Sequence, residues 1–310
     1  MSSPSVPSAL AAWSESLAGI VDLVGPGTLA VPGRHRRSLA SAVVWRAGIA
    51  VTAAHVFRRT PATLSLLAAG GEPIEASLAG IDSSTDLAVF RIGETAAPPL
   101  TPGDASTVRT GHFVIAVGRS TGGELSASAG IVNKVSGPWE TWLGGHLDRL
   151  IRLDGGVHDG LSGACVADAG GAVIGIASAA LSRSYGVVVP AATVSRVVDE
   201  LLSKGHVSRA FLGIGAQEVP IEPEQRTDPA RAVGLLITNI VAGGPAHVGG
   251  LRIGDILVDV NGIAAASLQD LRRGLADQVG KEVSASALRG GVATKLTLRV
   301  GQWPAEGRRC

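Results

Sequence analysis

Residues 41–57 read SAVVWRAGIAVTAAHVF, two short runs rich in β-branched residues that a glycine-containing break separates. Runs of this length and composition are typical of β-strands. The pattern recurs, with breaks of Gly, Pro, Asp and Ser, in residues 87–92, 113–117, 172–176 and 186–190. Because no long helical pattern separates these runs, they favour antiparallel barrels or a sandwich. The fold predicted for this part of the chain is mainly β.

The composition agrees with a β-rich chain of two domains. At 310 residues the chain exceeds the size at which a single core keeps growing. Apolar residues make up 45% of the chain, but aromatic residues only 3%, and there are 42 glycines. This balance favours strands packed by Val, Ile, Leu and Ala and joined by many tight turns.

The charge balance argues against a nucleic-acid partner. The chain has 27 basic and 26 acidic residues and a formal net charge of +1. It therefore lacks the positive field on which non-specific nucleic-acid binding relies. The short basic run at 34–37 is interpreted as a solvated loop.

Cysteine usage and the N-terminus say little about the compartment. Cys165 and Cys310 cannot form a framework of several disulfides, and they lack the spacing of a zinc or redox motif. The first ten residues, MSSPSVPSAL, have neither the basic start nor the apolar stretch of a secretory signal. No transmembrane segment is expected, because no apolar stretch approaches the roughly 20 residues of a spanning helix. The sequence as given is expected to be cytoplasmic, with an extracytoplasmic location open if a leader has been trimmed.

Residues 8–24 form the first of two helical patterns in the N-terminal two thirds of the chain. Apolar residues recur there at three- and four-residue steps, and Pro26-Gly27 ends the pattern. Such a helix could dock on its own domain or contact another subunit, and both interpretations stay open. The second pattern places Val194, Val198 and Leu201 on one face and ends near Gly205.

A second unit follows with its own local signals. Residues 234–240 form an apolar run, and residues 254–262 read as a strand that enters an Asn-Gly turn, a strong hairpin signal. A helix is predicted over 267–279, with Leu268, Leu271 and Leu275 inward, and a last strand over 295–300.

Three segments carry the residue types of a serine protease, in the order His, Asp, Ser. Peptide hydrolysis by a serine needs an imidazole that deprotonates the hydroxyl, a carboxylate that orients the imidazole, and backbone donors for the oxyanion. His55 follows an apolar strand, Asp86 precedes another, and Ser162 lies in a turn of small residues. A glycine two positions ahead of the serine lets the amides of Gly160 and Ser162 point at one spot. Each segment alone is a weak signal, because structural histidines, turn-capping aspartates and Gly/Ser turns are common.

Together the three segments resemble the HtrA/Deg family of chymotrypsin-fold serine proteases. The family pattern is Thr-x-x-His-Val, Thr-Asp-Leu/Ile-Ala-Val and Gly-Asn-Ser-Gly-Gly, and this chain reads TAAHV at 52–56, TDLAV at 85–89 and GLSGA at 160–164. The resemblance extends over roughly residues 15–303. It includes GIV at 130–132, GGAVIGI at 170–176, GVVVP at 186–190 and FLGI at 211–214.

The resemblance implies a fold, a domain order and a set of roles. The fold is a chymotrypsin-like double β-barrel protease domain, followed by a PDZ-like α/β module. The domains expected are an N-terminal amphipathic segment at 1–27, the trypsin-like domain at 28–203, the PDZ domain at 204–303 and a flexible tail at 304–310. Ser162 would be the nucleophile, His55 the general base and then acid, and Asp86 the residue that orients the imidazole. The amides of Gly160 and Ser162 would form the oxyanion hole, and neither a metal nor an organic cofactor is implied.

The sequence departs from the family at the serine turn. Leu161 replaces the usual Asn or Asp, Ala164 replaces Gly, and Cys165 replaces Pro. Because the oxyanion donors are backbone groups, these changes need not remove them, but a misplacement of about 1 Å can cost on the order of a hundredfold in rate. Cys165, at the start of an apolar strand, is interpreted as a buried structural thiol.

In the second unit the resemblance to PDZ modules centres on one short segment. Its amides would bind a peptide C-terminal carboxylate while the ligand adds a strand to the sheet, and the helix around Leu271 and Leu275 would form the other wall of the groove. An ordinary strand of the same domain is the alternative, because Ala210 replaces a glycine common before this loop. The segment consists of Phe211, Leu212, Gly213 and Ile214.

The resulting hypothesis is a serine endopeptidase that cleaves unfolded or misfolded proteins, with a PDZ domain that binds peptide C-termini and regulates activity. No acidic residue stands at 155–158, ahead of the serine, where trypsin-like proteases place one, so a modest apolar P1 side chain is expected. The alternative is a catalytically weak or inactive scaffold with a chaperone-like role. Family resemblance also implies homotrimers built through the N-terminal segment.

Overall fold

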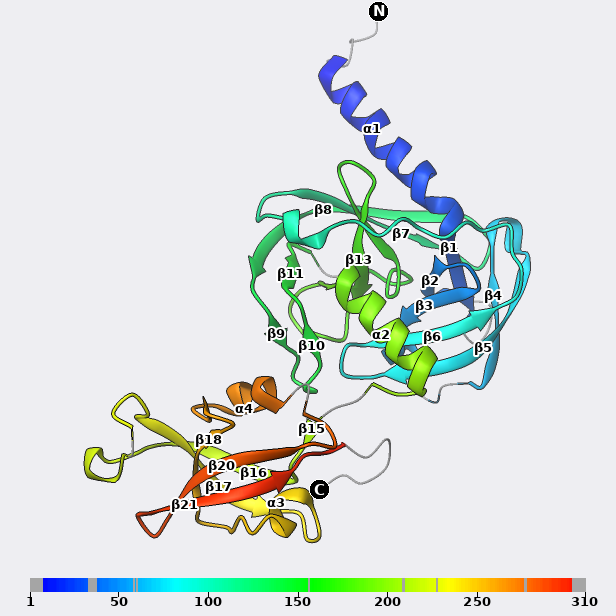
Figure 1. The fold of residues 1–310 in the computed structure, drawn as a ribbon. Coiled ribbons are helices and arrows are strands. Elements are labelled where there is room, and N and C mark those ends of the chain that lie inside the picture. The colour runs from blue at the N-terminus through cyan, green and yellow to red at the C-terminus, as the bar shows by residue number, and fades with distance from the viewer. Residues whose placement is uncertain are drawn as a thin grey trace, which may run out of the picture. The chain divides into compact units, whose positions relative to one another are not determined.

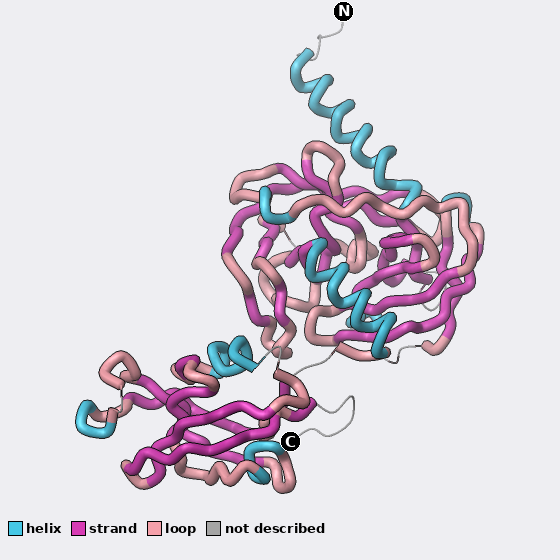
Figure 2. The backbone as a smooth tube through the Cα atoms, viewed as in Figure 1, coloured by secondary structure: helices cyan, strands magenta, loops and turns pink. Residues whose placement is uncertain are grey.

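The computed structural model describes residues 8–32, 38–57, 59, 61–155, 157–207, 210–226, 228–275 and 278–302. The basic run at 34–37, Cys310 and the predicted tail at 304–310 lie outside these residues. The chain divides into two compact units, residues 1–207 and 208–310, and strands run through both (Figure 2).

The first unit contains two closed, six-stranded barrels (Figure 1). The strand order of the first barrel is β1-β2-β3-β6-β5-β4 and that of the second is β11-β14-β13-β12-β7-β8. The first barrel consists of β1 (Thr28–Pro32), β2 (Ser38–Arg46), β3 (Ile49–Ala53), β4 (Thr63–Leu67), β5 (Pro73–Asp82) and β6 (Leu87–Ile92). The second consists of β7 (Phe113–Arg119), β8 (Leu125–Ser136), β11 (Leu150–Leu153), β12 (Cys165–Asp168), β13 (Val173–Ser178) and β14 (Val187–Pro190).

Side chains alternate in direction along the strands. One set fills the interior of each barrel, and the other set forms an apolar layer that the two barrels share. Successive strand residues point to opposite faces, so Ala50 packs inside the first barrel while Val51 faces outward. Val51 joins a cluster that also contains Val117 and Val189 of the second barrel. The packing of this shared layer fixes one barrel against the other, which matters because the candidate catalytic residues come from both.

Two helices and one small hairpin complete the first unit. Helix α1 (Ser8–Val24) and helix α2 (Ala191–Lys204) appear where the sequence predicts them, and Gly205 ends α2 in a left-handed conformation with φ of 74°. The hairpin joins β9 (Trp139–Glu140) to β10 (His146–Leu147). Short 3₁₀ turns lie at Gly25–Gly27, Ala54–Val56, Ala69–Gly71 and Ala105–Thr107, and one in the second unit at Pro223–Gln225.

The second unit is a sheet with two helices and its own apolar core. The sheet order is β16-β17-β18-β20-β21, so β16 stands at one end. Its elements are β15 (Ala210–Phe211), β16 (Ile214–Pro220), β17 (Val233–Ile240), α3 (Pro245–Val248), β18 (Ile256–Val260), β19 (Ile263–Ala264), α4 (Leu268–Leu275), β20 (Glu282–Arg289), β21 (Val292–Arg299) and β22 (Gly301–Gln302).

The local predictions for this unit hold, except that α4 is shorter than predicted, β21 begins at Val292 rather than at 295, and one short strand was not predicted. Asn261 and Gly262 both have positive φ, 49° and 76°, as the two-residue turn between β18 and β19 requires. Helix α4 ends at Leu275 rather than near 279; residues 276 and 277 are outside the described part, and 278 is no longer helical. Strand β22, which pairs with β15, was not predicted, because a two-residue strand carries no periodicity.

The predicted fold class is confirmed: the protein is mainly β, with a double-barrel domain followed by an α/β module. No helix in the described ranges is both long enough and apolar enough to cross a membrane.

Candidate active site

Asp86 lies in a tightly bonded turn between β5 and β6. The carboxylate of Asp82 accepts hydrogen bonds from the Ser84 hydroxyl at 2.8 Å and the Thr85 hydroxyl at 2.8 Å, and all three residues are buried. Asp86 itself has φ of 60°, a left-handed conformation that costs a residue with a Cβ about 1–2 kcal/mol. Aspartate tolerates this region better than most residues, and the hydrogen bonds of the turn hold it there.

His55 lies beside Asp86 because of strand pairing. Strands β3 and β6 are antiparallel with Ala53 opposite Leu87, so the residues just beyond Ala53 meet those just before Leu87. The Ala54 amide donates to the Asp86 carbonyl at 3.1 Å. The 3₁₀ turn that follows β3 then carries the His55 side chain past the carboxylate.

Two hydrogen bonds join His55 to the Asp86 carboxylate. The His55 amide donates to Oδ1 at 2.8 Å, and Nδ1 lies 2.8 Å from Oδ2. Because a carboxylate can only accept, Nδ1 carries the proton in the neutral ring and Nε2 keeps its lone pair. Asp86 is 3% exposed, whereas the His55 side chain is 32% exposed, so the imidazole is the solvent-facing member of the pair.

Ser178 is a third donor to this carboxylate, and sequence reasoning missed it. Its hydroxyl, at the end of β13 in the second barrel, donates to Asp86 Oδ2 at 2.6 Å and is buried. The only signal in the sequence is a polar residue that ends an apolar run, and such a residue is too common to single out. With Ser178, donors from both barrels fix the position of the carboxylate.

Ser162 lies in a turn that approaches the first barrel just ahead of His55. Gly163 packs so closely on β2 and β3 that a Cβ there would lie 2.6 Å from Thr52 Oγ1 and 2.9 Å from the Ala53 amide nitrogen. The Ser162 side chain is 8% exposed. Within the described residues its hydroxyl makes no hydrogen bond, to His55 included. Among the described residues, His55 therefore pairs with Asp86 and not with the Ser162 hydroxyl.

The turn ahead of Ser162 is of type II. The Leu161 amide donates to the His158 carbonyl at 3.0 Å, and Gly160, the third residue of the turn, has φ of 85°. This combination defines a type II turn, in which glycine is favoured at the third position. Among the described residues, no acceptor takes the amide protons of Gly160 or Ser162, the two donors predicted for an oxyanion hole.

The residues that depart from the family pattern are buried. Leu161 is 4% exposed and packs inside the second barrel, where an Asn or Asp side chain would need a hydrogen-bond partner. The Cys165 thiol lies 3.4 Å from the Val117 carbonyl, and burial raises its pKa to about 12. A thiol with that pKa stays protonated at neutral pH, which agrees with a structural role.

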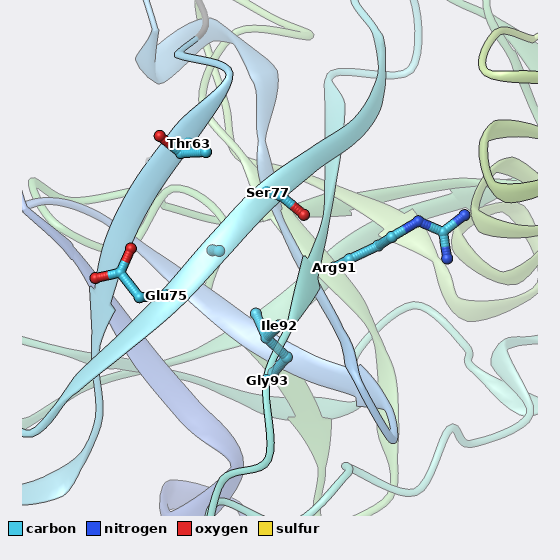
Figure 3. A pocket seen from close by; sticks show the side chains of 7 residues that line it. Thr63, Glu75, Ser77, Arg91, Ile92 and Gly93 are labelled. Carbon is cyan, nitrogen blue, oxygen red and sulfur yellow. The ribbon is translucent and has the colours of Figure 1, made fainter.

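The hollows on the described part of the first unit include the following two. One, of about 310 Å³, lies over β4, β5 and β6, and Thr63, Glu75, Ser77, Arg91, Ile92 and Gly93 line it (Figure 3). None of the candidate catalytic residues lines it. The other, of about 190 Å³, reaches the serine turn at His158 and Leu161, and its wall includes Gly155 and Val157. In the described ranges, no group of three or more His, Cys, Asp or Glu side chains is placed to hold a metal ion.

The predicted peptide-binding segment of the second unit connects β15 to β16. The Leu212 carbonyl accepts from the Ala246 amide at 2.9 Å, and the Gly213 carbonyl accepts from the Val241 amide at 2.8 Å. Both carbonyls are therefore used inside the domain, while the amides of Leu212 and Gly213 meet no acceptor in the part of the chain that is described. The segment leads into β16, the end strand of the sheet, and α4 contacts that strand.

Comparison with known proteins agrees with this architecture. Residues 40–176 match the family described as trypsin-like peptidase domain, and residues 236–286 match the PDZ domain family. A probable periplasmic serine endoprotease, DegP-like, of Halomonas elongata is 32% identical over 279 residues, which cover 87% of this chain and 57% of that protein. The protein of the same description from Brucella suis is 32% identical over 287 residues, 88% of this chain and 54% of that protein. The chain thus spans a little over half the length of these relatives.

Solved structures give the same result. The structure described as "HtrA-type protease AlgW with decapeptide" superposes with a TM-score of 0.78 at 25% identity and covers 93% of this chain and 99% of that chain. Barrels, serine turn and terminal sheet together define the class: a trypsin-like protease domain followed by a PDZ domain. Within that class, the chain belongs to the HtrA/Deg family of serine proteases.

Proposed function

We propose that the protein is a serine endopeptidase in which Ser162 is the nucleophile, His55 the general base and acid, and Asp86 the residue that orients the imidazole. The observation that carries the proposal is the 2.8 Å contact between His55 Nδ1 and Asp86 Oδ2. This contact keeps the lone pair of Nε2 available for a hydroxyl proton. The domain boundaries that accompany the proposal are 28–203 for the protease domain and 204–303 for the PDZ domain.

The proposed reaction proceeds in two balanced steps. Ser162 Oγ bonds to the carbon of the scissile carbonyl while its proton passes to His55 Nε2, and the imidazolium then protonates the leaving amine as the C–N bond breaks. Water then hydrolyses the acyl-enzyme: its oxygen bonds to the acyl carbon while its proton passes to His55 Nε2, and that proton goes to Ser162 Oγ as the ester bond breaks. Asp86 stabilises the imidazolium in both steps without becoming protonated.

The amides of Gly160 and Ser162 are the proposed oxyanion donors. Both are uncommitted among the described residues, and the type II turn supplies the left-handed glycine that lets amides two residues apart converge. Donors of this kind typically account for about 10²–10³ in rate each.

A modest apolar P1 side chain is proposed for the substrate. Gly186 donates its amide to the Gly155 carbonyl at 3.0 Å, so the approach to the serine and the start of β14 form adjacent walls. A Cβ on Gly186 would lie 3.1 Å from the Gly155 carbonyl oxygen and 3.1 Å from the Val157 side chain, so the space beside Gly186 is narrow. The Val157 side chain on this wall favours contact with a small apolar group.

The PDZ domain is proposed to bind C-terminal segments of unfolded or partly folded proteins and to regulate cleavage. The uncommitted amides of Leu212 and Gly213 suit a terminal carboxylate, and the exposed edge of β16 suits strand addition by the residues that precede it. Phe211 and Ile214 flank these amides and complete the proposed segment.

Assembly into homotrimers through the N-terminal segment, residues 1–27, is also proposed. Helix α1 buries Ile20 and Val24 against the barrels, but Leu10 and Trp13 remain about half exposed, at 54% and 49%. Large apolar side chains with that exposure are typical of contact surfaces.

The test of the proposed activity is cleavage of denatured casein by the wild-type chain and by Ser162→Ala. We expect the variant to lose about 10³-fold or more in rate, because the covalent step needs the hydroxyl. Ser136→Ala, which removes an exposed hydroxyl from β8, is the matched control and should cleave at the wild-type rate. Equal rates for wild type and Ser162→Ala, with no labelling of Ser162 by a phosphonate probe, would instead favour the alternative, a catalytically weak or inactive scaffold.

A further inference from the structure

Ser41, a residue of β2 that the proposed mechanism does not use, contacts the nucleophile turn on both sides of Leu161. Its hydroxyl donates to the Gly160 carbonyl at 2.7 Å, and its amide donates to the Ser162 carbonyl at 2.9 Å. Ser41 is fully buried, so the donor group of each bond is shielded from water. One residue of the first barrel, Ser41, therefore binds two carbonyls, those of Gly160 and Ser162, in a turn of the second barrel.

These two bonds constrain the peptide that carries the Ser162 amide. That peptide joins Leu161 to Ser162 and lies between the two peptides whose carbonyls Ser41 holds. Because each peptide is planar, fixing the planes on either side restricts the rotation of the one between them. The direction of the Ser162 amide and the position of the Ser162 Cα then depend on Ser41.

Ser41 is itself held in place by neighbouring backbone and side chains. Its hydroxyl accepts from the Arg119 amide at 3.0 Å, and its carbonyl accepts from Thr52 Oγ1 at 2.7 Å. Thr52 lies three residues before His55, on the strand that leads to the imidazole. The same network thus connects the nucleophile turn to the strand that places the base.

At its centre, the turn has no polar side chain that could restrain the orientation of its own peptides. The Leu161 side chain is buried in the apolar interior of the second barrel and has no group that could donate a hydrogen bond. The restraint must come from outside the turn, and Ser41 is the side chain that supplies it.

We propose that Ser41 is a positioning residue that orients the Ser162 amide and hydroxyl through the Gly160 and Ser162 carbonyls. This inference rests on the proposed role of Ser162 as nucleophile. Removing the Ser41 hydroxyl leaves the partly buried Gly160 carbonyl and the buried Arg119 amide without that partner, so the turn relaxes toward other acceptors and donors. The chemical step suffers more than substrate binding, because the misplaced groups act in the transition state.

The experiment compares Ser41→Ala with wild type on a peptide anilide with an apolar P1 residue. We expect kcat to fall by about 10- to 100-fold, the scale of a misplacement near 1 Å, with KM changed by less than about threefold. Labelling of Ser162 by a phosphonate should slow by a similar factor. Thr193→Val is the matched control: it removes another buried hydroxyl with two hydrogen bonds, both to Asp148, and should keep kcat within about twofold.

Three outcomes separate this inference from the proposed function. Wild-type kcat in a folded Ser41→Ala protein, while Ser162→Ala is inactive, overturns the role of Ser41 alone. Undiminished hydrolysis by Ser162→Ala overturns the proposed function on which that role rests. If Ser41→Ala does not fold, Ser41→Cys replaces it: a thiol is of similar size but a weak donor, so kcat should fall by more than about threefold, and an unchanged kcat overturns the inference.

Discussion

At the scale of single residues, the most constrained position near the nucleophile is Gly163. It has φ of 83°, and a Cβ at this position would lie 2.2 Å from the Ser41 carbonyl oxygen. Two separate effects, left-handed backbone and close approach, therefore require glycine here. The close approach, rather than the backbone conformation, reflects how tightly the serine turn packs on the first barrel.

Gly163→Ala should abolish the proposed protease activity by displacing the turn. We expect casein cleavage to fall at least about 100-fold, because the methyl group must push the turn away from Ser41 and Thr52. The measurement is the cleavage rate together with the thermal unfolding midpoint.

Gly111→Ala separates the two effects. Gly111 also has positive φ, 91°, but a Cβ there would meet nothing within 4 Å. It should therefore lose only about 1–2 kcal/mol of stability from backbone strain and keep its activity. Similar activities for the two variants would contradict the steric argument.

At the scale of elements, an ion pair joins β18 to β20 in the PDZ domain. Arg289 donates to both oxygens of Asp255, at 2.9 and 2.8 Å, and the Arg252 amide donates to Oδ2 at 2.8 Å. Burial alone would raise the pKa of Asp255, but these hydrogen bonds and the charge of Arg289 outweigh it and lower the pKa below its usual value. The carboxylate is 3% exposed, so the pair is a structural contact rather than a surface one.

The lowered pKa of Asp255 predicts how the stability of this domain depends on acid. A carboxyl group with a depressed folded-state pKa stabilises the fold above its unfolded pKa, near 3.9, and that stabilisation is lost as pH falls through the folded pKa. Asp255→Asn should cost about 2 kcal/mol at pH 7 and much less at an acidic pH below the lowered folded-state pKa. Amide hydrogen exchange of β18 and β20 at both pH values measures the difference.

A second aspartate–arginine pair provides the control for that experiment. Asp228 and Arg231 are 3.4 Å apart, and the Asp228 side chain is 50% exposed. Exposed pairs contribute about 0–1 kcal/mol, so Asp228→Asn should leave exchange in β18 and β20 nearly unchanged at both pH values. An equal effect of the two variants would argue against a special role for Asp255.

At the scale of the whole molecule, helix α1 exposes large apolar side chains among the described residues. Leu23 is 64% exposed, and Trp13 touches Phe113 edge-on while half of its surface remains accessible. The proposed trimer would bury these side chains and thereby stabilise the assembly by removing apolar surface from water.

Trp13→Asp should therefore lower the mass in solution without unfolding the barrels. A charge placed in a buried contact is costly, whereas the same charge on the exposed residue Ser14 should be tolerated. Sedimentation of wild type, Trp13→Asp and Ser14→Asp measures the outcome. The trimer proposal fails if wild type sediments as a monomer, and the role of α1 fails if Trp13→Asp keeps the wild-type mass.

The sequence alone determined the local structure and the residue types of the site. The strands around 41–57 and 87–92, helix α1 and the Asn261-Gly262 turn follow from periodicity and turn chemistry, which depend on neighbours along the chain. His55, Asp86, Ser162 and Gly160 could be named because the three segments that carry them together resemble the motifs of the HtrA/Deg family; their catalytic roles stay predictions.

Only the tertiary structure decided which groups hold those residues in place. Ser178 reaches Asp86 across 92 residues of chain, and Ser41 reaches the Gly160 carbonyl across 119. Both contacts cross from one barrel to the other, so they depend on how the shared apolar layer packs the barrels together. A serine in a strand carries no local mark of such a partner, because a hydrogen bond between distant strands depends on register and barrel packing rather than on neighbouring residues.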